Sequence, residues 1–366
     1  PITVKAMVTV DGITAYDEAT VTITPRAVSY RSTDAEKKYD GTPLTNSAVA
    51  RTSTLDFVAG EVTGVYAERT VTNAFDGPNK HGVVENVIRL ETTDSYIESN
   101  YTLELAHSKL TIHPRHVQLV SESATRPYDG TPLTRPNATV KGDGFVQAEL
   151  ESVRAIGTIT DVLYDAAGNV IGEENTVVYH TKGAYDERNY VFDTPDIGTL
   201  TVTPVEDKVV VTVTGHTLEK TYNGEEHVVS GFDMRCDNEL YHVNTDVGYD
   251  ADVMENDRAA RATNVNTVGD GKYMMGLTAS DFTNLNRNFK NVTFRVTDGW
   301  LKINPVAITI KAADDTKRYD GTPLTNSNWS ITGGAFVGSD EGFASVTVEG
   351  TQTLVGSADN LITGYV

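Results

Sequence analysis

The sequence predicts an all-β protein, built as a tandem array of small immunoglobulin-like β-sandwich domains. Thr and Val are abundant, and these β-branched residues fit pleated sheets but lose rotamer freedom in helices. A nine-residue motif returns at domain-sized intervals. Once in every interval, a stretch of alternating polar and apolar residues ends at a proline, as a strand does before a stiff joint.

The composition and net charge indicate which classes of binding partner to expect. The 366 residues are 39% hydrophobic and carry 30 Lys and Arg against 51 Asp and Glu, for a formal net charge of -21. Because nucleic-acid binding depends on cations that neutralise phosphates, we expect no nucleic-acid partner. No stretch reaches the roughly 20 consecutive apolar residues that cross a bilayer, so we expect no membrane insertion. The negative surface predicts a monomer.

The recurring motif defines the repeat. Lys-Tyr-Asp-Gly-Thr-Pro-Leu-Thr-Asn at 38–46 returns with small changes at 127–135 and 318–326, and a weaker copy begins at Thr221. Successive tyrosines of the motif are 89, 94 and 97 residues apart, the size of a small domain. We therefore expect each copy to fold around its own core. The signature residues are Tyr39, Asp40, Gly41, Pro43, Tyr128, Asp129, Gly130, Pro132, Tyr222, Asn223, Gly224, Tyr319, Asp320, Gly321 and Pro323.

Prolines mark the expected boundaries. The alternating segments end at Pro25, Pro114, Pro204 and Pro305, which lie 14, 14, 18 and 14 residues before the next signature tyrosine. A strand that stops at proline and restarts within two residues indicates a short, stiff interdomain joint. The predicted units are the closing strands of a preceding repeat at 1–25, repeat one at 26–114, repeat two at 115–204, a longer and divergent repeat three at 205–305, and a truncated repeat four at 306–366.

Repeat two illustrates the expected strand pattern. A turn with a short strand is predicted around Tyr128 to Leu133, and short strands are predicted near 116–120, 138–141, 153–160, 175–181, 189–192 and 199–203. The last two would form a closing hairpin around a turn from Asp193 to Gly198. About seven short strands per 90 residues are typical of an immunoglobulin-like sandwich. Residues 145–152 could instead form two helical turns, so a β-grasp-like repeat with one short helix is the competing fold.

Repeat four ends about two-thirds of the way through the pattern of the other repeats. Without closing strands, its sheet would keep an unpaired edge. We expect either disorder there or pairing with a neighbouring molecule in a crystal.

The Asp-Gly step of the motif predicts a tight turn. Asp can hydrogen-bond nearby backbone, and Gly accepts a positive φ. The proline two residues after the glycine would suit an edge strand, where a missing N–H costs nothing. The tyrosine and leucine that flank the turn would then plug the core. The alternative is a repeated sugar platform made of the tyrosine ring and the aspartate carboxylate.

These residues resemble a family, the Tyr-Asp-Gly repeats and related mostly-β, glycine-rich modules of bacterial cell-surface proteins and adhesins. The resemblance rests on Lys-Tyr-Asp-Gly-Thr-Pro-Leu-Thr, on Asn-Tyr before a closing hairpin and on Leu-Thr-Val-Thr-Pro at the repeat end, and covers the chain from about residue 20. It implies an extracellular segment on a bacterial, in particular Gram-positive, cell surface, with no catalytic residues to carry over. Repeat three departs from the motif with Tyr222-Asn-Gly-Glu-Glu-His, and no Leu-Pro-x-Thr-Gly sorting signal is present, so wall attachment is inferred.

No motif for catalysis or cofactor binding is found. Gly-x-x-x-x-Gly-Lys-Ser/Thr, Gly-x-Ser-x-Gly and His-Glu-x-x-His do not occur. We therefore assign no catalytic, cofactor-binding or metal residues and expect no enzyme. Calcium stays open as a cofactor, because Asp314-Asp315 and Asp250-Ala-Asp252 offer hard oxygen ligands, although no Asp-x-Asp-x-Asp-Gly loop is present.

Two functions remain. The first expectation is a non-catalytic stalk or spacer, whose partners are the neighbouring repeats of the same chain and which projects a distal region from the cell surface. The second is an adhesin module that binds a host glycan or an extracellular-matrix protein. Repeat three is the expected place for such binding, because its extra residues at 232–285 contain Tyr241, Tyr249 and Tyr273.

Overall fold

The computed structural model describes residues 2–338 and 340–366, and nearly all of its regular structure is β-strand. The chain is a tandem array of small all-β domains, and the all-β class is the one that the sequence predicts. It divides into two compact units, of which the first ends at Val202 and the second comprises Pro127–Thr131 and Thr203–Val366. None of the helices in the described residues has the length and apolar character needed to span a membrane.

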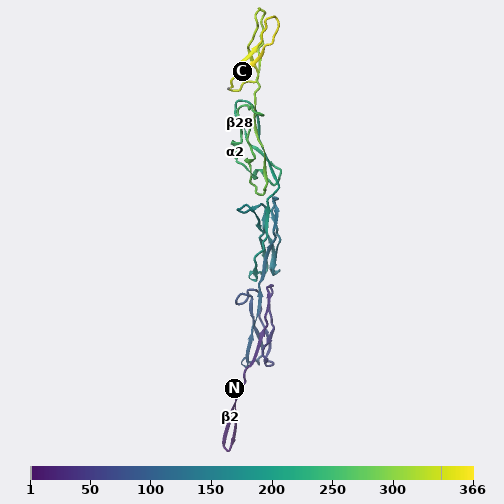
Figure 1. The fold of residues 1–366 in the computed structure, drawn as a ribbon. Coiled ribbons are helices and arrows are strands. Elements are labelled where there is room, and N and C mark those ends of the chain that lie inside the picture. The colour runs from purple at the N-terminus through teal and green to yellow at the C-terminus, as the bar shows by residue number, and fades with distance from the viewer. Residues whose placement is uncertain (1, 339) are drawn as a thin grey trace. The chain divides into compact units, whose positions relative to one another are not determined.

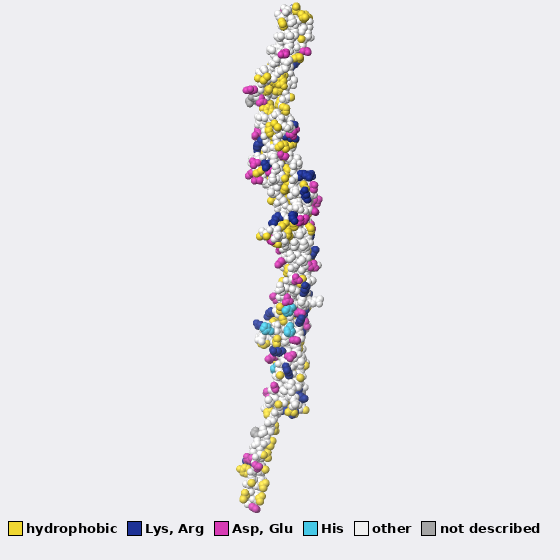
Figure 2. Space-filling view, in the orientation of Figure 1, with side chains coloured by type: hydrophobic (Ala, Val, Ile, Leu, Met, Phe, Trp, Pro, Cys, Tyr) yellow, Lys and Arg dark blue, Asp and Glu magenta, His cyan; other side chains and the backbone are white. Residues whose placement is uncertain are grey.

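A hairpin precedes repeat one. Strands β1 (Ile2–Val10) and β2 (Ile13–Val21) pair antiparallel (Figure 1). Asp11 and Gly12 form its turn with φ of 50° and 81°, the positive values that a two-residue hairpin turn requires. Every residue of both strands is exposed, and Figure 2 shows apolar side chains along the hairpin. Such a hairpin has marginal stability by itself.

Repeat one contains two three-stranded sheets, β5-β3-β9 and β4-β10-β7, and the pair β6-β8. In each three-stranded sheet an early strand runs parallel to a closing strand, β3 with β9 and β4 with β10. The elements are β3 (Arg26–Ser32), β4 (Ala35–Lys38), β5 (Val49–Arg51), β6 (Val62–Ala67), β7 (Val83–Asn86), β8 (Ile88–Thr92), the 3-10 helix η1 (Glu98–Asn100), β9 (Tyr101–Ala106) and β10 (Ser108–His113).

The two layers of repeat one meet in an aromatic-rich core. Alternate residues of β3, Val28 and Tyr30, are buried, as expected of a strand with one covered face. They pack with Tyr101 of β9 and with Ile88 of β8 in the opposite layer. This face-to-face packing of sheets makes the repeat a sandwich.

Repeat two has the same two three-stranded sheets, β14-β11-β21 and β12-β22-β19, and three strand pairs, β13-β16, β15-β20 and β17-β18. Its elements are β11 (Arg115–Ser121), β12 (Ala124–Pro127), β13 (Leu133–Thr134), β14 (Ala138–Gly142), β15 (Leu150–Ala155), β16 (Thr158–Ile159), β17 (Leu163–Tyr164), β18 (Val170–Ile171), β19 (Glu173–Glu174), β20 (Val177–Thr181), the 3-10 helix η2 (Glu187–Asn189), β21 (Tyr190–Phe192) and β22 (Thr199–Thr203).

Repeat three keeps this plan in β26-β23-β31 and β24-β32-β29, with the pairs β25-β28 and β27-β30, and adds two short helices (Figure 1). Its elements are β23 (Val209–Gly215), β24 (Thr217–Thr221), β25 (His227–Val229), β26 (Phe232–Cys236), α1 (Val243–Asp246), β27 (Val247–Gly248), α2 (Ala251–Asn256), β28 (Ala260–Ala262), β29 (Lys272–Met274), the 3-10 helix η3 (Ala279–Asp281), β30 (Thr283–Asn284), β31 (Val292–Thr297) and β32 (Trp300–Asn304).

Repeat four has only two-stranded sheets in its described residues. They are β33 (Thr309–Ala312) with β34 (Trp329–Gly333), and β35 (Val346–Glu349) with β36 (Leu361–Tyr365). Its β33 therefore has one partner, whereas the matching strands β3, β11 and β23 each have two.

The structure of repeat two agrees with part of the sequence prediction. Residues 145–152 form a turn and the start of β15, so the competing fold with a helix in each repeat is not seen there. The predicted turn and short strand around Tyr128 to Leu133 correspond to the turn at 128–132 and to β13. One detail of the prediction is wrong. The expected closing hairpin is absent, because β21 pairs parallel with β11 whereas β22 belongs to the other three-stranded sheet. A periodic pattern identifies strands but does not identify their partners.

Candidate functional site

The signature turn has the same geometry in every repeat. Its glycines, Gly41, Gly130, Gly224 and Gly321, have φ of 79°, 76°, 77° and 78°. This left-handed conformation costs glycine little because it has no Cβ. The preceding side chain closes the turn by accepting a hydrogen bond from the backbone N–H two residues later: Thr42 to Asp40, Thr131 to Asp129, Glu225 to Asn223 and Thr322 to Asp320, at 2.9–3.0 Å. Both Asp and Asn serve because the oxygen that accepts is common to the two side chains.

Lysine and threonine hold the turn aspartate ionised. In repeat four, hydrogen bonds from the backbone and side chain of Thr322 and from Lys317 lower the pKa of Asp320 to about 2. The same Lys-to-Asp pair occurs in repeat one, where Lys37 Nζ lies 2.7 Å from Asp40. The prolines precede the next bridge or strand: Pro43 precedes the bridge of Leu44 with Val71, and Pro132 precedes β13.

The turn is anchored to the closing strand of its own repeat. The backbone N–H of Tyr39 donates to His113 O, that of Tyr128 to Thr203 O, and that of Tyr222 to Asn304 O, each at 2.8 Å. Each acceptor is the residue just before the proline that ends the repeat. The proline and the tyrosine, which mark opposite ends of a repeat in sequence, therefore meet in the structure.

Tyr39 is buried, as expected of a residue that plugs the core, and its side chain also contacts the next repeat. Its hydroxyl donates to Glu149 Oε1 of repeat two at 2.5 Å, and the other oxygen of Glu149 accepts from Tyr190 at 2.6 Å. The two tyrosine rings pack edge to face with centroids 5.9 Å apart. Tyr39, Tyr190 and Glu149 are all buried, and Glu149 is only 4% exposed. A shared hydrophobic cluster, which includes Leu110 of repeat one and Val117 of repeat two, surrounds them.

Burial and the carboxylate together keep these tyrosines protonated. Burial raises the pKa of Tyr39 and of Tyr190 above the ordinary value, and in each the hydrogen bond to Glu149 raises it further. A neutral hydroxyl can donate to a carboxylate, whereas a tyrosinate beside it would add a second buried negative charge.

Other side chains of repeat two hold the neighbouring repeat. Arg115 donates to the carbonyl oxygen of Tyr39 at 3.1 Å and to that of Gly144 at 2.7 Å. Asn189, which is fully buried, accepts from the backbone N–H of Ala74 at 2.8 Å. A buried backbone group thus finds its partner in the next repeat, which makes the joint specific as well as apolar.

In unit two, the signature tyrosines Tyr128 and Tyr222 also contact the repeat that follows their own. Tyr128 packs edge to face on Phe289, with centroids 5.7 Å apart, and Phe289 packs in turn on Tyr241. Tyr222 donates to Asp340 Oδ1 at 2.9 Å in a more exposed setting. The signature tyrosine of repeat four, Tyr319, is 64% exposed.

A short sequence motif marks the acidic residue that accepts the hydrogen bond from a tyrosine hydroxyl, and the sequence prediction does not include it. Phe-Val-x-x-Glu/Asp occurs at 57–61, 145–149 and 336–340. In all three the backbone N–H of the acid donates to the carbonyl oxygen of the valine, at 3.1, 2.9 and 3.0 Å, so the same turn presents the carboxylate. Repeat three lacks the motif and has an aromatic residue without a hydroxyl, Phe289, where repeat two has Tyr190.

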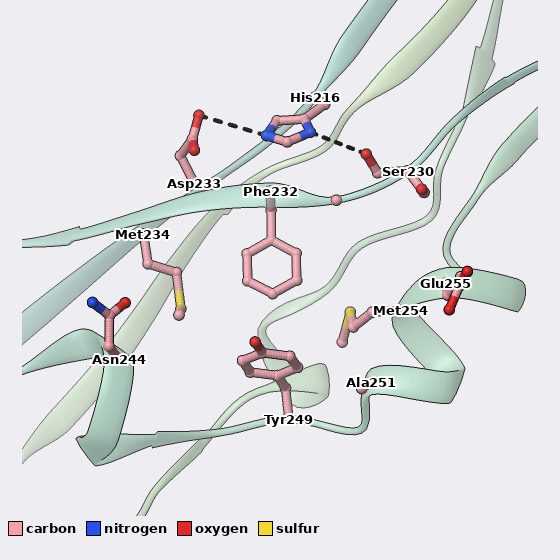
Figure 3. A pocket seen from close by; sticks show the side chains of 11 residues that line it. His216, Ser230, Phe232, Asp233, Met234, Asn244, Tyr249, Ala251, Met254 and Glu255 are labelled. Carbon is pink, nitrogen blue, oxygen red and sulfur yellow. Dashed lines mark hydrogen bonds and ion pairs between the residues drawn. The ribbon is translucent and has the colours of Figure 1, made fainter.

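Repeat three also has an open pocket of about 470 Å³ on its surface (Figure 3). Phe232 and Tyr249 meet edge to face there with centroids 5.1 Å apart, and Met234 and Met254 line the same hollow. His216 lies at its rim, 3.6 Å from Asp233. An aromatic ring beside carboxylates can stack on a sugar ring or hold an apolar side chain.

The three tyrosines predicted as ligand-binding residues are not brought together. Tyr249 lines the pocket and is 47% exposed. Tyr241 is buried, and its hydroxyl lies 3.0 Å from both Asp246 O and Asn284 Oδ1, so it is a core residue. Tyr273 is half-buried and donates to Asn264 O at 3.0 Å.

The aspartates considered for calcium have structural partners. Asp250 accepts from two backbone N–H groups at the start of α2, and Asp314 lies 3.2 Å from Lys311. In the described residues, no group of three or more His, Cys, Asp and Glu side chains is placed to hold a metal ion.

Comparisons with known proteins give no family. No family model and no curated protein matches the chain. Among solved structures, it is similar to the N-terminal eight Ig domains of Down Syndrome Cell Adhesion Molecule (DSCAM) isoform 1.30.30, with 12% identity and a TM-score of 0.15. That match covers 90% of this chain, which spans about half of that structure (48%). A likeness at this score carries no functional argument.

Proposed function

We propose that this chain is a non-catalytic spacer segment of a bacterial cell-surface protein, in which tyrosine joints hold consecutive repeats together and so keep a distal region away from the surface. The observation that carries the proposal is the buried contact of Tyr39, Glu149 and Tyr190 between repeats one and two. A spacer needs joints that resist bending. A joint with a shared apolar cluster and satisfied polar groups resists bending better than a flexible linker does.

The extracellular setting rests on the resemblance to Tyr-Asp-Gly repeats. Acidic composition suits this setting, because a net charge of -21 keeps such a protein soluble and limits nonspecific association. The absence of an internal disulfide is compatible with it, because the cores and the buried joint provide the stability instead.

The test is the alignment of repeats one and two in solution, measured with residual dipolar couplings. Tyr39→Ala removes a buried ring and its hydrogen bond, so we expect the two repeats to reorient independently while each keeps its fold. Tyr249→Ala, which alters a surface in repeat three, is the control and should leave the alignment unchanged. Independent tumbling of the two repeats in the unmodified chain would contradict the spacer proposal.

The second candidate is binding of a host glycan or matrix protein by repeat three, and the pocket around Tyr249 favours it. A deletion of 232–285 is a poor test, because this segment contains the core residues Tyr241, Met254 and Phe282. Tyr249→Ala is the better variant because Tyr249 is half exposed. Binding in a glycan and matrix screen that is lost in Tyr249→Ala and kept in Tyr16→Ala, an exposed tyrosine on β2, would establish the adhesin function.

A further inference from the structure

Repeat three differs from repeat two in the segment that follows β27. Residues 249–259 connect β27 with β28, whereas repeat two has only residues 156–157 between the matching strands β15 and β16. The strands match because β28 pairs antiparallel with β25 as β16 does with β13. The longer segment begins with Tyr249 and contains α2. It therefore adds a surface to repeat three that repeat two lacks the residues to build.

The backbone on both sides of Tyr249 is fixed. The strand before it, β27, pairs antiparallel with β30. The residue after it, Asp250, caps α2 by accepting from the backbone N–H groups of Asp252 and Val253 at 3.0 and 3.2 Å. An aromatic side chain held in this way loses little conformational entropy when it binds a partner.

The ring of Tyr249 lies over apolar side chains and stays partly open to solvent. Figure 3 shows Phe232 of β26 projecting toward it, with Met234 and Met254 on either side of the two rings. Besides this pocket of about 470 Å³, Tyr249 lines a second open hollow of about 660 Å³. Methionine side chains are flexible and polarisable, so the pocket can adapt to an apolar stem inserted beside the ring.

Acidic side chains flank the ring. Glu255 lines the pocket that Figure 3 shows, and Asp252 lines the second hollow. Both are exposed, and neither forms an ion pair within the part of the chain that the structure describes. The described residues that line the two hollows include no Lys or Arg. The ring is therefore the centre of a surface with uncompensated negative charge.

The surrounding sequence strengthens this charge. Residues 236–257 contain seven Asp and Glu and no Lys or Arg. Arg258, which follows them, is paired with Asp281 at 2.8 Å. His216 at the pocket rim lies 3.6 Å from Asp233. Acidic groups around a hollow raise the local concentration of cations, so the surface selects a positively charged partner.

We infer that this surface of repeat three binds an arginine side chain presented by a basic segment of another protein, with the guanidinium stacked on Tyr249 beside Glu255 and Asp252. A planar guanidinium stacks on an aromatic face and donates to carboxylates at the same time. Its apolar stem fits against the two methionines. A sugar ring can also stack on Tyr249, but it has no charge for the carboxylates to select.

The inference rests on the second candidate function, binding by repeat three, and narrows the partner to a basic protein. It is independent of the spacer function, which depends on the joint between repeats one and two.

An NMR titration of the unmodified chain, labelled at its methionine methyl groups, tests the inference. The probe is an acetylated and amidated Gly-Arg-Gly-Arg-Gly peptide. We expect it to shift the signals of Met234 and Met254 but not that of Met7, which is exposed on β1. The same peptide with citrulline in place of arginine is planar but uncharged, so it should bind at least about threefold more weakly. Raising the salt from about 0.05 M to about 0.5 M should weaken binding of the arginine peptide, because exposed charges are screened.

Variants at exposed positions identify the residues responsible. Tyr249→Ala and Glu255→Gln should each weaken binding about two- to fivefold. Tyr249→Phe keeps the aromatic face and should retain binding. Glu104→Gln removes one exposed carboxylate on β9, so it is the control matched for charge and should leave binding unchanged.

The inference would be overturned if the arginine peptide left Met234 and Met254 unshifted, or if the citrulline peptide or Tyr249→Ala gave equal binding. A titration with methyl glucoside separates this failure from failure of the second candidate function. Shifts of the two methionines by the glucoside alone would overturn the inference and keep binding by repeat three. No shift with either probe, together with no binding in the glycan and matrix screen, would contradict both.

Discussion

At the scale of single residues, Glu149 decides how repeats one and two meet. Its two oxygens each accept a hydrogen bond from a tyrosine hydroxyl, one from each repeat. A buried carboxylate is costly unless it is hydrogen-bonded, and here both oxygens are satisfied. The residue therefore links the two repeats rather than serving either one alone.

We predict that Glu149→Gln destabilises the joint by about 1–3 kcal/mol, because an amide has one oxygen and leaves one buried hydroxyl without an acceptor. Hydrogen exchange of the Val146 and Tyr190 amides measures this loss. The matched control is Glu151→Gln, two residues along and exposed. Equal exchange in the two variants would show that the second hydrogen bond contributes nothing to stability.

The joint should also weaken in alkali. Burial, followed by the hydrogen bond to Glu149, raises the pKa of Tyr39 and of Tyr190. Unfolded tyrosine loses its proton near pH 10 while the folded residues keep theirs, so this stabilisation is complete below about pH 10 and is lost as the pH rises further. The thermal midpoint should fall more steeply above pH 10 in the unmodified chain than in Tyr39→Phe. If the thermal midpoint fell equally steeply in the two proteins, the raised pKa of Tyr39 would not contribute to stability.

At the scale of elements, the signature turn is a rigid device that presents one tyrosine. Its glycine has a positive φ in all four repeats, and the side chain before it closes the turn. The sequence predicts this turn because Asp or Asn can accept a hydrogen bond from the backbone two residues later and Gly adopts a positive φ at little cost. It does not predict the parallel pairing of β4 with β10, because residues 75 positions apart share no local signal.

We predict that Gly41→Ala costs about 1 kcal/mol of stability. A Cβ there meets nothing closer than 3.7 Å, so the cost is the strain of the left-handed backbone. Gly77→Ala should cost several times more, because its Cβ would lie 2.1 Å from the carbonyl oxygen of Val83. Denaturant unfolding of the two variants compares the costs, and similar losses would mean that strain rather than contact dominates at both positions.

At the scale of the molecule, the joint changes what counts as a folding unit. The cluster that contains Leu110 of repeat one extends to Val117 and Tyr190 of repeat two. Repeat one therefore has a core of its own around Val28 and Tyr30 and shares a second cluster with repeat two. Repeats that share a core are coupled in stability, as neighbours in other repeat proteins are.

We predict that Leu110→Ala lowers stability by about 2–5 kcal/mol and also lowers the protection of the Val117 and Tyr190 amides in repeat two. Leu301→Ala, a fully buried leucine in unit two, is the control. It should leave those amides unchanged. Hydrogen exchange of repeat two in both variants makes the comparison, and unaffected protection in Leu110→Ala would mean that the repeats open independently.

The amino-acid sequence by itself determined the β-class, the period of the repeats and the signature turn, because strand alternation, glycine conformation and proline geometry act over a few residues. Only the tertiary structure decided which strands pair, that Tyr39 meets Glu149 of the next repeat, and that Tyr241 is buried whereas Tyr249 is exposed. These contacts join residues up to 110 positions apart. They depend on how whole sheets close and stack, which no local pattern specifies.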